Sequence, residues 1–322
     1  MKSIASAPGK IILFGEHFVV HGTPAILAAI DKRVAVTSTF TENKTIRVNS
    51  EMVLGTLEVP THIPADKLRH PIVELPFRPF IYLANKMINS HQDVNGLEIT
   101  IDSDIPIGVG LGSSSACCVA AAASISGLFK ELSSEEILKM SIEAEKTIFP
   151  DTSGADCTVC TYGGMIEYPS IEKIDNTFGL NLLIANSMIP HNTKNSVEKV
   201  NKFKENDEER FSQLCDLETK LIDEVITAMK NNDATTFGLK MSENQKYLEE
   251  IQISNDTLRD MISSLKEISL GTKITGAGDG GCIIALVKDE NMDKVPALLP
   301  KDKEYFSAKI DTKGVVWSTI EE

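Results

Sequence analysis

The pattern of apolar and polar positions changes along the first half of the chain from strand-like to helix-like. Runs rich in β-branched residues, with turn signals beside them, predict strands at Ala7–Val20, Val34–Phe40, Thr45–Asn49 and Leu97–Ile101. Two helices are expected after these strands. One covers Ser113–Phe129, and the other opens at a capping box formed by Ser133 and Glu136 and continues to about Thr147.

The second half repeats the alternation of strands and helices. It begins with a strand-like segment at Asn181–Ala185 and continues through polar amphipathic helices over Ser196–Lys266. The chain then returns to strands at Cys282–Val287, Tyr305–Ile310 and Val315–Ile320. We expect a domain boundary near Pro169–Gly179, which divides the chain into residues 1–172 and 173–322.

Composition and charge limit the classes of partner. The chain has 322 residues, of which 42% are apolar, as expected of one large or two moderate folded domains. Its 32 basic and 46 acidic residues give a net charge of -14, which disfavours a broad surface for nucleic acid or for an anionic membrane. The nearly apolar stretch Ala116–Phe129 is too short to span a bilayer, and the N-terminus lacks a signal-peptide profile. We therefore expect a cytoplasmic protein that holds any phosphate ligand locally.

The six cysteines are scattered along the chain. Cys157 and Cys160 have the C-x-x-C spacing of a redox site or of half a zinc site. No second C-x-x-C or H-x-H pair completes four zinc ligands, so buried small residues in a reducing compartment are the favoured interpretation.

A glycine-rich segment is the first candidate for chemistry. In "IPIGVGLGSSSACC", residues 105–118, Gly108, Gly110 and Gly112 precede three serines that open the expected helix. Glycines let the backbone approach a ligand closely, and a helix N-terminus offers N–H groups and a positive dipole end. The segment predicts a phosphate cradle, with an ordinary strand-to-helix turn as the alternative. Its spacing differs from both the dinucleotide-binding and the P-loop patterns.

Two further stretches carry a resemblance to a known family. "APGKIILFGEHFVVHG" covers residues 7–22, and "KITGAGDGGCIIAL" covers residues 273–286. Together with the glycine segment they resemble the three signature motifs of the GHMP kinases, and the first motif is most similar to that of the mevalonate kinases. The resemblance implies an α+β, two-domain fold. Its N-terminal domain is like the second domain of ribosomal protein S5, its C-terminal domain is ferredoxin-like, and the active site lies between the two.

The resemblance also implies a nucleotide site and a catalytic pair. The nucleotide site comprises Pro106, Gly108, Gly110, Leu111, Gly112, Ser113, Ser114, Ser115 and Ala116. "SGADCTVCTYGG", residues 153–164, places Asp156 opposite the acceptor hydroxyl with Lys10 beside it. Without the resemblance, an aspartate near a helix start is more often a cap.

Mg²⁺ is the implied cofactor, with ATP as co-substrate. The resemblance assigns the ion to Ser114 and Glu145, whose hydroxyl and carboxylate are hard oxygen ligands. Glu143 lies two residues from Glu145, and either side chain could instead be a solvated helix charge.

The acceptor site is implied by residues of three motifs. Glu16 and His17 match positions beside the acceptor pocket, Thr193 in "IPHNTKNS" is a further contact, and Gly276 and Ala277 belong to the third motif. His17 and His21 are four residues apart, but "EHFVVH" is not the H-E-x-x-H zinc pattern.

The activity implied by the resemblance is phosphorylation of the 5-hydroxyl of mevalonate by ATP. The alternatives are phosphomevalonate kinase, homoserine kinase, a kinase acting at another hydroxyl of mevalonate, or a non-catalytic ligand-binding relative. Mevalonate and ATP are the expected small-molecule partners, and a homodimer is one option for the assembly.

Overall fold

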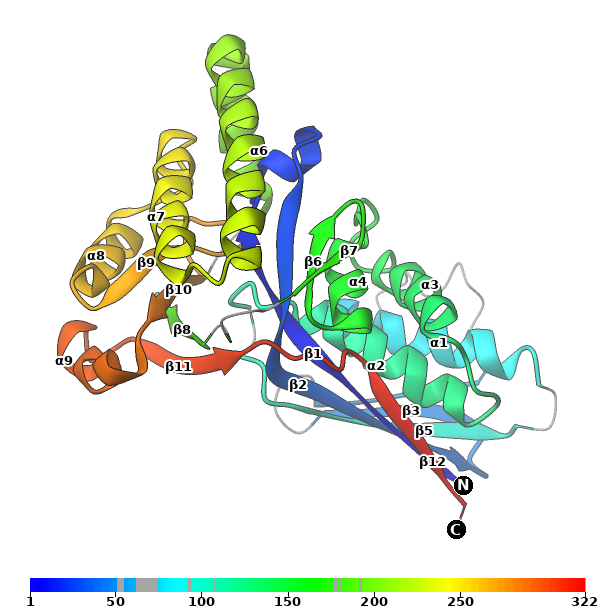
Figure 1. The fold of residues 1–322 in the computed structure, drawn as a ribbon. Helices are drawn as coiled ribbons and strands as arrows, with labels where there is room; N and C mark the ends of the chain where they lie inside the picture. Colours follow the sequence, from blue (N-terminus) through cyan, green and yellow to red (C-terminus); the bar gives the residue numbers. More distant parts are fainter. Residues whose placement is uncertain are drawn as a thin grey trace.

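The computed structural model describes residues 1–50, 55–61, 74–91, 94–106, 108–175, 179, 181–190 and 193–321. Two sheets with their helices lie at opposite ends of an elongated molecule, and the long first strand leads from one end toward the other (Figure 1). The expected α+β class is confirmed.

The larger sheet has eight strands. They are β1 (Lys2–Phe14), β2 (Ala25–Thr41), β3 (Thr45–Ser50), β4 (Gly55–Pro60), β5 (Gly96–Ser103), β6 (Met165–Tyr168), β7 (Glu172–Ile174) and β12 (Val316–Ile320). The main order is β12-β1-β2-β5-β3-β4, and β6 joins β2 to β7. All pairs are antiparallel except β3 and β5, which run parallel.

Helices cover one face of this sheet (Figure 1). They are α1 (Arg78–Ile88), α2 (Ser113–Gly127), α3 (Ser134–Glu145) and α4 (Ala155–Tyr162). Short 3-10 turns lie at Phe18–His21, which contacts α6 (Glu208–Lys230) of the other half, and at Leu75–Phe77 before α1. α2 consists largely of alanine, serine and other small residues, so it packs closely against β1 and β2 and is buried over most of its length. This central helix fixes the segment before it, the glycine loop, against the sheet.

The smaller sheet has four antiparallel strands in the order β11-β8-β10-β9. Its strands are β8 (Asn181–Asn186), β9 (Ser269–Ile274), β10 (Cys282–Val287) and β11 (Glu304–Lys309), and its helical elements are α5 (Thr193–Asn206), α6 (Glu208–Lys230), α7 (Ala234–Glu250), α8 (Asp256–Leu265), a 3-10 turn (Asp289–Lys294) and α9 (Val295–Leu298). Within this sheet β8, the first of the four strands in the chain, lies between β11, the last, and β10, the third. This is the order expected for a ferredoxin-like domain.

Several local expectations are confirmed and others need correction. α2 and the capping box of Ser133 and Glu136 are present as predicted. The expected strand Ala7–Val20 is wrong at its end, because β1 stops at Phe14 and the chain turns through Gly15 at φ +95°. The apolar residues after Phe14 form a 3-10 turn instead of continuing the strand.

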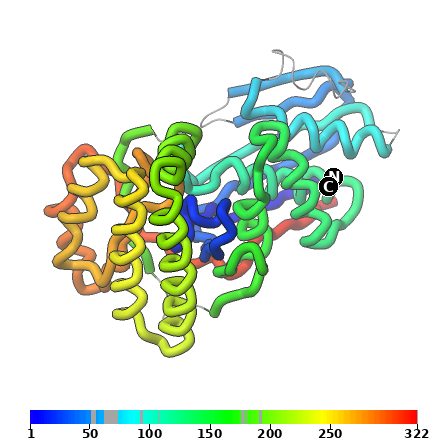
Figure 2. Tube along the Cα trace, turned by 90° about the horizontal axis from the view of Figure 1, so that it is seen from above, coloured from blue at the N-terminus to red at the C-terminus, as the bar shows by residue number. Residues whose placement is uncertain are grey.

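The division of the chain at residues 172 and 173 stays a prediction, and residues 176–178 of the expected boundary lie outside the described residues. The last strand crosses this division, because β12 pairs with β1 at the edge of the larger sheet. Seen from above, the two termini lie together while α6 and α7 lie side by side at the other end (Figure 2).

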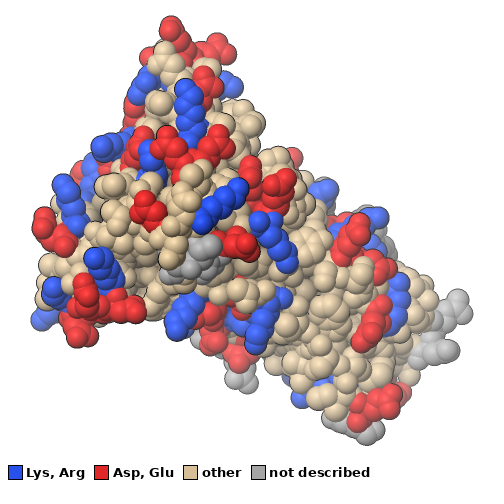
Figure 3. Space-filling view, viewed as in Figure 1, with Lys and Arg blue, Asp and Glu red and all other residues tan. Residues whose placement is uncertain are grey.

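The surface carries charges of both signs. On the face shown in Figure 3, Lys and Arg side chains are interspersed with Asp and Glu side chains. Among the residues that the structure describes, no helix is long and apolar enough to cross a membrane.

Candidate active site

The three glycine-containing motifs meet around the second half of β1. The backbone N–H of Lys10 donates to the carbonyl oxygen of Leu111 over 2.9 Å, which joins the glycine loop to the strand. From the third motif, Thr275 Oγ1 accepts from the N–H of Ile12 at 3.0 Å and donates to the carbonyl oxygen of the same residue at 2.9 Å. Segments more than 260 residues apart are thus held side by side.

The glycine loop has the backbone shape that a phosphate cradle needs. Gly108, Gly110 and Gly112 have φ values of +72°, +86° and +73°. Gly112 is the N-cap of α2 without a side-chain cap, so the first turn of the helix presents N–H groups that have no intrahelical partner. A Cβ at Gly276 would lie 3.8 Å from the carbonyl oxygen of Gly110, so the third motif adjoins this loop. Ile107 lies outside the described residues.

Lys10 and Asp156 form an ion pair beside the loop. Lys10 Nζ lies 3.1 Å from Asp156 Oδ2, with 6% of the lysine side chain and 35% of the aspartate side chain exposed. The N-cap of α4 is Gly154, without a side-chain cap, and Asp156 lies in the first turn. The structure therefore gives Asp156 a buried cationic partner and an open side, which suits a group that faces a ligand better than it suits a cap.

Glu145 lies at the end of α3 beside the first turn of α2. Its side chain is buried; Oε1 accepts a hydrogen bond from Ser115 Oγ, and Oε2 accepts one from Thr152 Oγ1 at 2.6 Å. Glu143 points elsewhere, because its carboxylate accepts hydrogen bonds from Lys86 and Tyr82. Partial burial acts to raise the pKa of Glu143, but these two partners outweigh it and the pKa is lowered. Of the two candidates, Glu145 is the one that lies beside the first turn of α2.

His17 joins the first motif to the third. Its Nε2 lies 2.8 Å from the carbonyl oxygen of Ala277, and its backbone has φ +62°, a left-handed value that is strained for a histidine. Burial lowers the pKa of His17, so the ring is neutral near pH 7. Because a carbonyl oxygen only accepts, Nε2 carries the proton and Nδ1 is left as an acceptor.

Glu16 is enclosed in the protein interior. Its side chain is 0% exposed and pairs through Oε1 with Lys273 Nζ, which is equally buried. Burial raises the pKa of Glu16 and lowers that of Lys273. Direct contact of Glu16 with an acceptor stays a prediction, and in this structure its carboxylate has no exposed surface.

Thr193 is exposed at the first residue of α5, and His191 and Asn192 of the same motif lie outside the described residues. α5 is attached to the third motif one to two turns later. There Asp279 accepts from Lys199 Nζ at 2.8 Å and from Ser196 Oγ at 3.4 Å. This attachment places Thr193 on a helix that contacts the loop of Gly276 and Ala277.

Comparisons with known proteins identify the family of the chain. The GHMP kinases N terminal domain matches residues 79–164, and the GHMP kinases C terminal domain matches residues 225–297. The mevalonate kinase of Thermococcus sibiricus is 34% identical over 330 residues, which cover 98% of this chain and 98% of that protein. The chain belongs to the GHMP kinase family.

Solved structures extend the likeness of this GHMP kinase to its fold. The crystal structure of the Methanococcus jannaschii mevalonate kinase has a TM-score of 0.82 at 28% identity, covering 96% of this chain and 98% of that chain. The L. major mevalonate kinase in complex with R-mevalonate has a TM-score of 0.76 at 25% identity, covering 95% of both chains. The family and the two-domain fold expected from the motifs are therefore confirmed. As a GHMP kinase, the chain is an ATP-dependent phosphotransferase.

The structure also shows polar residues of this GHMP kinase that the sequence analysis missed. Thr152 holds Glu145, Lys273 pairs with Glu16, and the carboxylate of Glu218 accepts the backbone N–H of Gly15 at 2.9 Å. One signal was present in the sequence. Glu218 lies four residues from both Leu214 and Ile222 on the apolar face of α6, where a charge requires a buried partner.

The cysteines of the expected redox or zinc alternative are free thiols in this structure. Cys157 and Cys160 are buried, and burial raises the pKa of each well above its usual value. Thiols with a raised pKa are poor nucleophiles and poor metal ligands at neutral pH.

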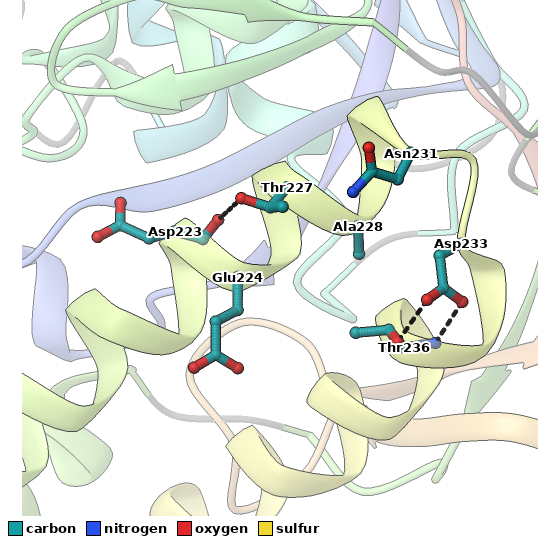
Figure 4. A pocket seen from close by; sticks show the side chains of 7 residues that line it. All are labelled: Asp223, Glu224, Thr227, Ala228, Asn231, Asp233 and Thr236. Atoms are coloured by element: carbon teal, nitrogen blue, oxygen red, sulfur yellow. Dashed lines mark hydrogen bonds between the residues drawn. The ribbon is translucent and has the colours of Figure 1, made fainter.

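A cavity of about 320 Å³ lies between α6 and α7, away from the three motifs (Figure 4). Its lining consists of Asp223, Glu224, Thr227, Ala228, Asn231, Asp233 and Thr236. The charged groups of the lining are acidic, so the cavity does not suit the phosphates of a nucleotide.

Proposed function

We propose that this GHMP kinase is an ATP-dependent mevalonate kinase, which converts mevalonate and ATP to 5-phosphomevalonate and ADP. The observation that carries the proposal is the Lys10–Asp156 pair, 3.1 Å apart, beside a glycine loop that ends at the N-terminus of a buried helix. The acceptor is inferred from the relatives, which are named mevalonate kinases, and from the neighbour solved with R-mevalonate.

The reaction requires a positioned alcohol and a stabilised phosphoryl group. We assign the phosphates of ATP to the loop from Pro106 to Ala116 and the acceptor hydroxyl to the open side of Asp156. Asp156 accepts the proton of the acceptor hydroxyl while the oxygen of that hydroxyl bonds to the γ-phosphorus. At the same time the bond between the γ-phosphorus and the oxygen that bridges it to the β-phosphate breaks, which releases ADP. Lys10 orients the carboxylate through the ion pair.

A Mg²⁺ site is supported by the buried carboxylate of Glu145 beside the first turn of α2. In that turn Ser114 offers a hydroxyl one residue before Ser115, which donates a hydrogen bond to Glu145. We assign the ion to Ser114 and Glu145. When bound, it neutralises charge on the β- and γ-phosphates.

For the acceptor pocket we propose His17, Gly276, Ala277 and Thr193 as contacts, with Glu16 behind them. Because Nε2 of His17 is engaged by Ala277, its Nδ1 is suited to accept a hydrogen bond from a hydroxyl of the acceptor.

We also place the reaction in the cytoplasm. A homodimer is the assembly to test, by light scattering of the purified protein.

The deciding experiment is an ADP-release assay on the unmodified protein with four acceptors: mevalonate, phosphomevalonate, homoserine and galactose. We expect the highest kcat/KM for mevalonate, and phosphorus NMR of the product should show a phosphate ester at the 5-oxygen. A higher kcat/KM for another acceptor would replace the mevalonate assignment within the same kinase class. No ADP release with any acceptor would favour a non-catalytic relative.

A further inference from the structure

The turn that carries His17 has positive φ values at two of its three residues. Gly15 has φ +95°, and a Cβ there would lie 2.6 Å from the Cα of Ala25. His17 follows at φ +62°, a value that is strained for a residue with a side chain. Such a turn keeps its shape only when surrounding groups hold it.

Glu218, from the other half of the molecule, is one of the groups that fix the shape of this turn. It lies on α6, 203 residues from Gly15 in the chain, and its Oε1 accepts the Gly15 N–H at 2.9 Å. Its Oε2 accepts from Asn244 Nδ2 of α7 at 2.6 Å. Both oxygens of a fully buried carboxylate are thus engaged, one by the strained turn and one by the neighbouring helix.

The position of Glu218 is costly for a carboxylate. Burial and the nearby charge of Glu16 raise the pKa of Glu218 to about 7, and Lys273 offsets only part of this effect. A buried leucine would avoid the desolvation cost, so burial alone does not account for a glutamate here. What the glutamate provides is an acceptor long enough to reach the backbone N–H of Gly15.

We propose that Glu218 is a positioning residue for acceptor binding: it holds the Gly15–His17 turn so that the ring of His17 stays at the acceptor pocket. The proposal rests on the proposed function of that pocket. Glu218 is 0% exposed, so it acts through the turn and not on the substrate itself. The Lys10–Asp156 pair is held separately by β1, α4 and the glycine loop. Loss of Glu218 therefore affects the KM of the acceptor and not the chemical step.

Three substitutions of Glu218 separate the effect of its side-chain length from the effect of its charge. Glu218→Ala removes the acceptor, Glu218→Asp keeps the charge but shortens the side chain by one methylene, and Glu218→Gln keeps an oxygen at the same reach without the charge. We expect Ala and Asp to raise the acceptor KM roughly tenfold, as for a lost buried hydrogen bond, with kcat and the KM of ATP within about twofold. Gln should return the acceptor KM to within about threefold of the unmodified protein.

Glu224→Ala is the matched control on the same helix. Its side chain is 57% exposed and pairs with Lys240, and we expect an unchanged acceptor KM. The proposal is overturned if folded Glu218→Asp keeps the normal KM, or if Gln is no better than Asp. If Ala does not fold, the comparison of Asp with Gln still decides.

The test is independent of the identity of the acceptor. Each KM is measured with the acceptor that the unmodified protein prefers in the four-acceptor assay. A preference for homoserine, for example, would contradict the mevalonate assignment while leaving the effect of Glu218 on acceptor KM fully testable.

Discussion

A Cβ added to Gly112 would lie 2.6 Å from Cγ of Lys10, so the glycine loop and the lysine of the proposed catalytic pair occupy adjoining space. Only glycine at position 112 lets the loop and the side chain of Lys10 keep these positions. The N-cap of α2 and the ion pair with Asp156 therefore depend on the same position.

Gly112→Ala should displace Lys10 as well as strain the loop at φ +73°. We expect kcat/KM to fall by roughly 10²-fold, because small displacements of positioned groups are costly in catalysis. Gly55→Ala is the control: it has a similar φ of +69°, but its Cβ would meet nothing within 4 Å. Steady-state kinetics of both folded variants test the prediction, and equal losses would contradict it.

Glu145→Gln should raise the Mg²⁺ concentration that gives half-maximal rate by roughly 10- to 100-fold. Thr152→Ala should have a smaller effect in the same direction, since Thr152 orients one oxygen of Glu145. The two effects should be non-additive because they act on one carboxylate. Magnesium titrations of the rate provide the measurement. Glu143→Gln is the control, and a larger shift in that variant would move the assignment to Glu143.

Protonation of His17 should weaken acceptor binding in acid. Burial lowers the pKa of His17 below its usual 6.5, while the charges of Asp279 and His21 act in opposite directions. The acceptor KM should therefore be constant from about pH 8 to 6.5 and rise below that range as Nδ1 gains a proton. His17→Ala should raise KM throughout and remove this acidic limb. A limb that persists in the variant would assign it to another group.

Glu218 should make folding less favourable as pH rises through the neutral range. Its folded pKa of about 7 lies above the unfolded value of 4.5, so the folded state binds more protons between these values. The stability contributed by the protonated form is complete below about pH 4.5, declines up to about pH 7 and is then lost, a change on the order of 3 kcal/mol. Urea unfolding of the unmodified protein and Glu218→Gln at pH 5 and 8 tests this. Parallel pH dependences would contradict it.

Features with short-range signals were predictable from the sequence. The capping box of Ser133 and Glu136 needs only residues three positions apart, and α2 follows from a run of small residues after glycines. The proximity of Lys10 and Asp156 came from the family motifs, since nothing in the local pattern joins β1 to α4.

Features that depend on distant partners were not predictable. The end of β1 at Phe14 is set by tertiary contacts that favour a turn over further strand, although the residues after it are apolar. The burial of Glu16 depends on Lys273, 257 residues away, and Glu218 reaches Gly15 across 203 residues. Hydrophobic periodicity shows that Glu218 lies on a buried face but does not show which group it binds.

The account as a whole depends most on Asp156 acting on the acceptor hydroxyl with Lys10 beside it. The most direct test is the single-turnover rate of Asp156→Asn with saturating ATP and mevalonate, compared with its affinity for ATP by calorimetry. We predict a rate lower by roughly 10²- to 10⁴-fold with ATP affinity unchanged, and no further loss when Lys10→Met is added. A folded Asp156→Asn protein with a near-normal rate would contradict the assignment and make the 3.1 Å ion pair a purely structural contact.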